Sequence, residues 1–586
     1  MIKKWLTVIG KTILLLIGIT FLSFLLVYHS PGDPAMVALK KSGMRVSEEA
    51  LELKREELGL NDPFAVQYGR WLNEFFHGDL GESYKTGKAV AGELKKTIPA
   101  TLLLTVAALA LTILISFPIG VLCAKYKDRG FDNMIRFVTY FLSSLPSFFL
   151  ALLMMYVLSM KLQLLPVIGS VSGKGIIMPA LVLALTLSAW YIRQIRGIVL
   201  QELEQEYVDG LKSRGASENR ILFFPRAEKL YASDCYVAWH VIWNSAWRFC
   251  HCGNYFFLAG SRKTCCDIHQ RAGLSGDSGL CCLDGNDLPA DKCCSRVFVS
   301  DSGSKSQKGK ECTMKKMDGK FKISLLFLAV ILIIPVIGPH LIRHDPYAVN
   351  VRNAFLSPCK EYLFGTDNLG RCVFCRILAG SRTSIYTALL IVGIVFLVGT
   401  LVGILAGFAG GVLDEILMKI TLVFQAFPAF VLSIAIAGIL GVGLWNGVLA
   451  LSAVYWTTYA RLSRSLVVSM KQENYIYAAR MNGVPLYRMI TAYILPNMMG
   501  SLIVTAAMDI GSVILSMAGL SFLGLGAARP TAEWGAVMSE ARDYLQKAPW
   551  IIVFNGLALF LVVTVFQLFG DRLSEFVHKK EARTEN

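Results

Sequence analysis

The sequence predicts an all-α polytopic membrane protein. Hydrophobic residues make up 54% of the 586 residues and charged residues only 17%, which is too apolar for an ordinary soluble multidomain protein. A helix needs roughly 20 mostly apolar residues to cross a bilayer. Ten segments approach or exceed that length, in a group of four and a group of six: 7–28, 101–124, 137–160 and 176–192, then 322–341, 385–408, 420–442, 447–467, 499–525 and 549–569.

The first segment also has features of a secretory signal, because the basic start MIKKW precedes an apolar stretch. No small-residue cleavage site follows it, so we expect it to be retained as a membrane helix.

The net charge of +16 is explained by membrane topology. The basic residues lie beside alternate span ends, as the positive-inside rule expects for a cytoplasmic N-terminus. They include Lys3, Lys4, Lys125, Lys127, Arg129, Arg193, Arg196, Lys315 and Lys316. No basic patch interleaved with aromatic residues remains on a soluble face, so membrane lipid is an expected partner and nucleic acid is not.

An internal repeat links the two groups of spans. The stretch EYVDGLKSRGASENRILFF (206–224) follows the first group's last span, and NYIYAARMNGVPLYRMITAYILPN (474–497) stands within the second group. Aligning their glycines brings similar residues into register: Gly215 with Gly483, Tyr207 with Tyr475, Val208 with Ile476 and Lys212 with Arg480. Each copy predicts a helix, a break at the glycine and a second amphipathic helix. A helix lying on the lipid surface is the alternative interpretation.

These residues resemble the cytoplasmic coupling loop of ABC importer permeases. The match is carried by Ala478, Ala479, Gly483, Leu495 and Pro496, while Tyr477 departs from the glutamate usual in that family. Three further stretches are similar to signatures of the peptide and nickel importer permeases: HGDLGESY (77–84), FGTDNLGR (364–371) and LSFLGLGAARPTAEWG (520–535).

The resemblance implies two fused repeats of the ABC importer permease fold, with about 4 + 6 transmembrane helices. It implies a multi-pass protein of the bacterial inner membrane that imports nickel, free or chelated, or di- and oligopeptides. A cytoplasmic ABC ATPase would dock on the coupling loops, and an extracytoplasmic solute-binding protein would deliver the solute. The implied ATPase-coupling residues are Glu473, Tyr475, Ala478, Ala479, Gly483, Ile490, Leu495 and Pro496, with Glu206, Tyr207 and Gly215 in the first copy. We expect Gly483 to let the two helices of the loop pack at a sharp angle without a side chain in the way.

The chain itself lacks the G-x-x-x-x-G-K-[ST] phosphate-binding motif, of which GSVSGKG (169–175) is the nearest approach. We therefore expect no cofactor and no enzymatic activity, with ATP hydrolysed by a separate subunit. The alternative is a secondary transporter or channel built from repeats, with a cytoplasmic metal-binding cysteine-rich insert. Against it, the spans carry almost no charge for an ion relay, and a channel has no use for two docking loops.

The segment 225–313 holds ten of the 14 cysteines and lacks a good membrane span. A zinc or nickel domain is disfavoured because Cys265, Cys266, Cys281 and Cys282 stand in adjacent pairs without finger spacing. Disulfides are disfavoured because topology places the segment in a reducing compartment.

A shifted reading frame explains this segment better. Moved one base forward, PRAEKLYASD permits a continuation equivalent to YILPN, and TMK (313–315) permits a stop codon that overlaps the codon of Met314. The predicted organisation is therefore an incomplete first permease at 1–224, with about four spans and the start of a coupling loop. An out-of-frame, disordered segment follows at 225–313, and a complete second permease with about six spans at 314–586.

Two further features remain open to interpretation. Asp509 lies mid-span, so it belongs either to the translocation path or to a hydrogen bond with a neighbouring helix. Cys372 and Cys375 stand where the family usually has Asp and Ser, with Cys359 nearby. A disulfide is compatible with an oxidising compartment, but we favour two packed thiols and predict no metal site, because no histidine or carboxylate constellation accompanies them in the sequence.

Overall fold

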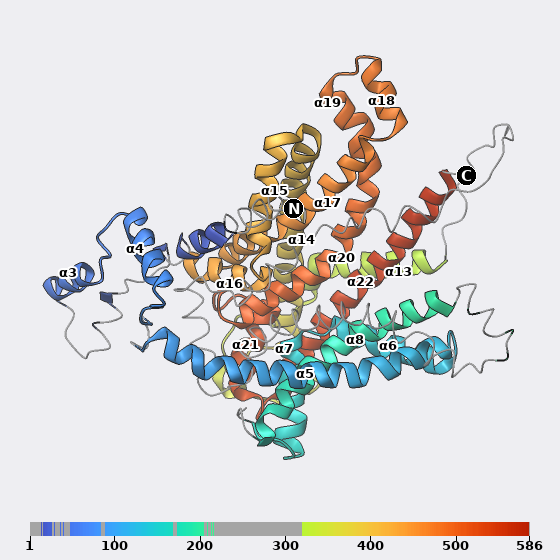
Figure 1. Cartoon of the computed structure of the whole chain (residues 1–586). Helices are drawn as coiled ribbons and strands as arrows, with labels where there is room; N and C mark the ends of the chain where they lie inside the picture. The colour runs from blue at the N-terminus through green and yellow to red at the C-terminus, as the bar shows by residue number, and fades with distance from the viewer. Residues whose placement is uncertain are drawn as a thin grey trace.

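The computed structural model describes residues 47–83, 88–167, 173–203 and 319–584, together with parts of 13–39 and single residues at 208, 213 and 215. Their regular structure is helical, with loops, turns and two isolated β-bridges between the helices, which confirms the all-α fold class (Figure 1). The segment 225–313, predicted to be out of frame and disordered, lies outside the described residues, so that expectation stays a prediction.

The first group comprises two short helices followed by long apolar ones. They are α3 (Glu48–Glu57), α4 (Phe64–Phe76), α5 (Val90–Lys125), α6 (Gly130–Ser144), α7 (Ser147–Met154), which continues as a wider turn over Met155–Lys161, and α8 (Ile177–Leu203). The second group begins with α13 (Gly319–Ile337) and α14 (Val373–Ala409), then α15 (Gly411–Gln425), α16 (Ala429–Leu440), α17 (Leu444–Met470), α18 (Asn474–Met481), α19 (Leu486–Arg488), α20 (Leu495–Phe522), α21 (Trp534–Ala541) and α22 (Pro549–Thr584).

Within the described residues, six helices are long and apolar enough to cross a membrane, or up to eight spans when two bent pairs are included. The six are Val90–Lys125, Gly173–Gln201, Phe321–Leu341, Val373–Ala409, Leu486–Phe522 and Pro549–Val577. Two predicted spans remain. One is α17, which is less apolar than the six and carries Arg461 and Arg464, and the other is the first segment, described only as the short apolar helix Leu16–Leu25.

The predicted spans 137–160 and 420–442 are not single straight helices. The pair α6 and α7 bends by 102°, and the pair α15 and α16 bends by 85°. In both, a proline with extended backbone stands directly before the second helix, Pro146 in one and Pro428 in the other. Proline lacks the amide hydrogen that continues a helix and disfavours helical geometry in the residue before it, so each span breaks there.

Small residues set the closest helix crossings. The most extensive helix contact of the second group joins α14 to α17, and that of the first group joins α5 to α8. A Cβ atom added at Gly403 of α14 would lie 2.5 Å from the Ala460 carbonyl oxygen and 2.5 Å from Ser463 Cβ. One added at Gly120 of α5 would lie 2.8 Å from Ile195 Cβ. Because Ile195 and Ser463 correspond when Gly215 is aligned with Gly483, the two groups pack in the same register.

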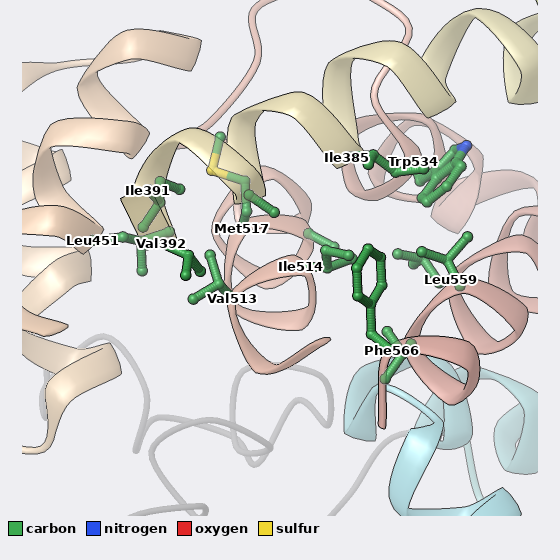
Figure 2. Packing of buried hydrophobic residues seen from close by; sticks show 14 of the residues in the cluster. Ile385, Ile391, Val392, Leu451, Val513, Ile514, Met517, Trp534, Leu559 and Phe566 are labelled. Carbon is green, nitrogen blue, oxygen red and sulfur yellow. The ribbon is translucent and has the colours of Figure 1, made fainter. Parts of the chain in front are cut away.

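The main apolar core draws on both groups. Figure 2 shows Ile391 and Val392 of α14, Val513 of α20 and Phe566 of α22 packed together, and Phe149 of the first group belongs to the same cluster. The groups also meet directly, since the rings of Phe148 and Phe522 stack at 4.8 Å. The Ser144 hydroxyl donates to Gln567 Oε1 at 2.9 Å.

At the end of the bundle opposite the loop between α17 and α20, the structure brings together sequence signatures that stand far apart in the chain. Arg371, from FGTDNLGR, forms ion pairs with Asp367 at 2.6 Å and with Glu540 of α21 at 2.7 Å. The fully buried Glu533, from PTAEWG, accepts the Ala536 amide at 2.9 Å and caps α21. Burial raises the pKa of the Glu533 carboxyl. The Arg371–Glu540 ion pair thus ties the chain that leads into α14 to α21.

Candidate functional site

The predicted coupling loop is the segment between α17 and α20. It contains α18, a turn at Gly483, α19 and a wider helical turn over Met489–Ile494 that runs directly into α20. Figure 1 shows α18 and α19 projecting at one end of the molecule, with α21 toward the opposite end. A helix pair held beyond the bundle is placed to contact a separate protein.

Gly483 ends α18 in a Schellman motif. The Gly483 amide donates to the Arg480 carbonyl at 3.1 Å, and the Val484 amide donates to the Ala479 carbonyl at 3.1 Å. These two bonds require a left-handed residue after the helix, and the φ of Gly483 is +67°. No other group lies within 4 Å of a Cβ atom built there. A side chain at this position would thus obstruct no neighbouring group, so the reason for the glycine is its backbone conformation, which turns the chain between the two helices.

The first copy shows the same local geometry where it is described. The φ of Gly215 is +76°. Val208 and its aligned partner Ile476 are both buried, at 2% and 1% exposure. Glu206 and Tyr207, predicted as coupling residues, lie outside the described residues.

The inner side of the loop packs on the bundle. Ile476, Met489 and Ile494 belong to the main apolar core, and Ala479 is 6% exposed. Ala479, predicted as a coupling residue, packs its small side chain on the bundle, and its coupling role stays a prediction. The remaining predicted residues of this copy divide by exposure: Ile490 and Leu495 are half-buried, while Glu473, Tyr475, Ala478, Gly483 and Pro496 are exposed.

The outer side of the loop carries large apolar residues without cover. Tyr477 is 54% exposed, Met481 89%, Leu486 54% and Tyr487 70%. We call these four residues the outer apolar set. Tyr477 and Met481 lie four residues apart and therefore share one face of α18. Sequence analysis did not select this set as a site. The sequence did contain an indication of this set. Apolar residues lie on both sides of a short helix, and only one side of that helix can face the bundle.

Two arginine–aspartate pairs hold the stems of the loops. Arg464 of α17 binds both carboxylate oxygens of Asp414 on α15, at 2.5 and 2.7 Å. Arg196 of α8 binds Asp132 on α6 in the same way, at 2.7 and 2.6 Å. Arg196 and Arg464 are equivalent in the alignment of Gly215 with Gly483. Two-point pairing of this kind fixes orientation as well as distance, so each pair orients the helix that leads into its loop.

Asp509 is half-buried on α20, beside the hydroxyl group of Tyr459 on α17. Tyr459 is 1% exposed. On the same helix pair, the hydroxyl groups of Tyr455 and Ser516 are hydrogen-bonded at 2.9 Å. The carboxyl group thus faces a polar strip between two helices. Its membership of a translocation path stays a prediction.

Cys372 and Cys375 are buried free thiols. The sequence predicted that no histidine accompanies these two cysteines, and the structure shows that this prediction is wrong. The structure brings His344 to both thiols, with one ligand atom of each residue within 4.8 Å of the others. The histidine comes from the loop after α13, and no local spacing in the sequence could have indicated that contact.

The left-handed conformation of Gly483 predicts how strongly different side chains at this position would weaken the association with a docking partner. We expect Gly483→Val to cost about 1–2 kcal/mol in the native loop, because a side chain is strained at positive φ. Because the free loop can relax out of this conformation while docking requires it, the cost corresponds to a roughly 5- to 30-fold weaker association with a docking partner. Gly483→Asn is the matched control, since asparagine tolerates this conformation. Titration of the partner onto each variant measures the difference, and equal weakening by both substitutions would contradict the conformational reason.

Comparisons with known proteins agree with this geometry. The family model "Binding-protein-dependent transport system inner membrane component" matches residues 116–227 and 399–579. A second model, describing the N-terminal part of such membrane components, matches residues 1–105. The repeat is thus visible as two matches of one family, and the second match contains the whole coupling loop.

Individual relatives align with somewhat less than half of the chain. The nickel transport system permease protein NikC of Escherichia coli (strain K12) is 36% identical over 254 residues, which are 43% of this chain and 92% of the relative. The probable D,D-dipeptide transport system permease protein DdpC of the same strain is 38% identical over 257 residues, 44% of this chain and 86% of the relative.

The dipeptide transport system permease protein DppC of Alkalihalophilus pseudofirmus is 36% identical over 258 residues, 44% of this chain and 85% of the relative. With two matches to the family model, a wholly helical set of spans and a repeated loop geometry, the chain belongs to the family of binding-protein-dependent transport system inner membrane components.

Proposed function

We propose that the chain supplies the membrane-spanning part of an ATP-driven importer for nickel, free or chelated, or for di- and oligopeptides. In this proposal a separate cytoplasmic ABC ATPase provides the energy, and an extracytoplasmic binding protein delivers the solute. The N-terminus and both coupling loops lie in the cytoplasm, as the placement of lysine and arginine residues predicts.

The observation that carries the proposal is the outer apolar set on the projecting loop. Exposed apolar residues gathered on one element mark protein interaction sites, and a short amphipathic helix laid into a groove is a recurrent mode of recognition. Met481 at 89% and Tyr487 at 70% exposure are the most accessible of the set. They are the residues that an ATPase groove would cover.

The loop is built to transmit force as well as to bind. Its inner side is continuous with the main core through Ile476 and Met489, and it runs into α20 without an intervening flexible segment. The Lys471 ammonium group donates to the carbonyl oxygens of Gly407 and Phe408 at the end of α14, at 3.2 and 3.0 Å. Movement of a docked ATPase would therefore be passed directly to α14, α17 and α20.

Nickel and peptides both remain within the proposed substrate class. The names of the relatives support both, since NikC is a nickel permease at 36% identity and DdpC a D,D-dipeptide permease at 38%. In the sequence, "DIG" at Asp509 together with PTAEWG and EARDYL tilts the resemblance toward the nickel branch.

We further propose that a frameshift truncates the first copy. The domains are then an incomplete first permease (1–224), an out-of-frame segment (225–313) and a complete second permease (314–586). The first family match ends at residue 227, whereas the second continues to residue 579. By the alignment of Gly215 with Gly483, the first match stops at the end of the coupling loop. The counterparts of α20 and α22 are then missing from the first copy.

This proposal predicts that removing one base near codon 224 yields two separate proteins, the second starting at Met314. Together with the ATPase and binding protein, the restored pair should import radioactive nickel or labelled dipeptide into proteoliposomes, and the fused chain should not, because half of one pore wall is missing. Serine replacement of all ten cysteines in 225–313 serves as the control and should leave the fused chain inactive. Transport by the fused chain that depends on those cysteines would contradict the frameshift proposal.

A further inference from the structure

The side chains of His344, Cys372 and Cys375 form a compact cluster outside the coupling loop, which we call the His–Cys–Cys cluster. One ligand atom from each residue lies within 4.8 Å of the others. The cluster stands where α14 begins, at the end of the bundle opposite the coupling loop. Neither the proposed import function nor the docking of an ATPase uses it.

The two thiols are positioned by the helix itself. Cys372 caps the N-terminus of α14, where its sulfur accepts the Cys375 amide at 3.4 Å. They are 4% and 2% exposed, so solvent does not compete for them. The positive end of a helix dipole stabilises anions, and thiolates are favoured in such positions. The first turn of this 37-residue helix therefore directs a positive potential toward a metal-bound thiolate.

The histidine is held by its own neighbours. Its ring stacks on that of Tyr362, with centroids 5.0 Å apart and planes 24° from parallel. The Tyr362 hydroxyl accepts a hydrogen bond from Asn353 Nδ2 at 3.2 Å. His344 is half-buried, so the cluster is closed toward the protein by the thiols and accessible from the histidine side. A metal ion could enter from that side without unfolding α14.

We propose that the His–Cys–Cys cluster binds one thiophilic transition-metal cation of the Zn²⁺ class. Two thiolates and a neutral imidazole are preferred ligands of such ions, and three protein ligands with one open position is a known zinc geometry. Two thiolates also neutralise a divalent cation, which suits a buried site. The bound ion would clamp the loop that carries His344 to the N-terminus of α14.

This proposal stands independently of the transport function, because its readout is metal binding. The test uses the full chain purified in detergent without reductant. Co²⁺ is the probe, because cobalt bound by thiolates has a strong ligand-to-metal charge-transfer absorption. We expect the Cys372→Ser, Cys375→Ser double variant to lose one equivalent of thiolate-bound Co²⁺ relative to the unmodified chain, and Zn²⁺, but not Mg²⁺, to displace that equivalent.

Cys359→Ser is the matched control. Cys359 is exposed, lies close in sequence and accepts the Tyr362 amide at 3.4 Å, but it is not a member of the cluster. Its replacement should leave the Co²⁺ spectrum unchanged. The ten cysteines of 225–313 are common to every version compared, so their binding cancels in the difference.

A second variant keeps the test decisive if the double variant fails to fold. His344→Gln leaves both thiols in place and should weaken Co²⁺ binding roughly tenfold or more. Equal stoichiometry and affinity in the unmodified chain and both variants would overturn the proposal. A disulfide between Cys372 and Cys375 in the protein as isolated would overturn it too, by showing a redox pair in place of a metal site.

Discussion

Replacing Met481 and Tyr487 together with glutamate will abolish the association of the chain with the ABC ATPase that we propose as its partner. These side chains are 89% and 70% exposed, so the substitutions remove no packing from the permease itself. In a docked complex they would be buried, and loss of two anchoring residues costs about 4 kcal/mol or more, roughly a thousandfold in affinity. Burial of unpaired carboxylates adds to that cost.

The measurement is co-purification of the ATPase with the full chain, followed by titration to obtain the dissociation constant. Val351→Glu is the matched control, because Val351 is also apolar, 69% exposed and outside the helices of the bundle, but lies at the opposite end of α14 from the coupling loop. The control should retain the ATPase. Unchanged affinity of the double variant for the ATPase would contradict the docking proposal and favour the alternative, a helix lying on the lipid surface.

Replacing Gly403 with leucine will prevent the second group of helices from folding. A Cβ atom at this position would lie 2.5 Å from the Ala460 carbonyl oxygen and 2.9 Å from the Arg464 amide nitrogen. Backbone atoms cannot rotate away as a side chain can, so α17 would have to separate from α14. Overpacking typically costs 1–3 kcal/mol, and a clash with backbone at the most extensive helix contact among the described residues exceeds that range.

Gly393→Leu, on the same helix, is the control. No atom lies within 4 Å of a Cβ built at Gly393, and leucine has a better helix propensity than glycine by somewhat under 1 kcal/mol. Thermal unfolding followed by fluorescence-detected size exclusion should show a normal transition for Gly393→Leu and aggregated protein for Gly403→Leu. Similar profiles for the two variants would mean that α14 and α17 do not cross at Gly403.

The sequence alone predicted the helical membrane class because apolar segments of sufficient length are a local property. It also located the turn between the two short helices of the predicted coupling loop, because a glycine with positive φ marks it, as in Gly215 and Gly483. The bends at Pro146 and Pro428 were missed even though the prolines were visible. Hydropathy alone treats an apolar segment as continuous, whereas a missing amide hydrogen interrupts the helix within it.

Other features depended on contacts between distant residues. The pairing of Arg464 with Asp414 requires α15 to fold back beside α17, and the approach of His344 to Cys372 requires a loop to return to the start of α14. Neither pair has a characteristic spacing. The outer apolar set was also missed, because resemblance directed attention to Ala479, which the structure buries at 6% exposure, and away from Met481.

ATP hydrolysis by the reassembled transporter is the most direct measurement of the proposed function. The restored pair of permeases, reconstituted with the separate ABC ATPase, should hydrolyse ATP faster when the solute-loaded binding protein is added. The same permeases without the ATPase should show no hydrolysis and no import. Stimulation should also disappear when Met481 and Tyr487 are replaced with glutamate. Solute import that continues without the ATPase, or hydrolysis unaffected by the permeases, would contradict the assignment of this chain to an ATP-driven importer.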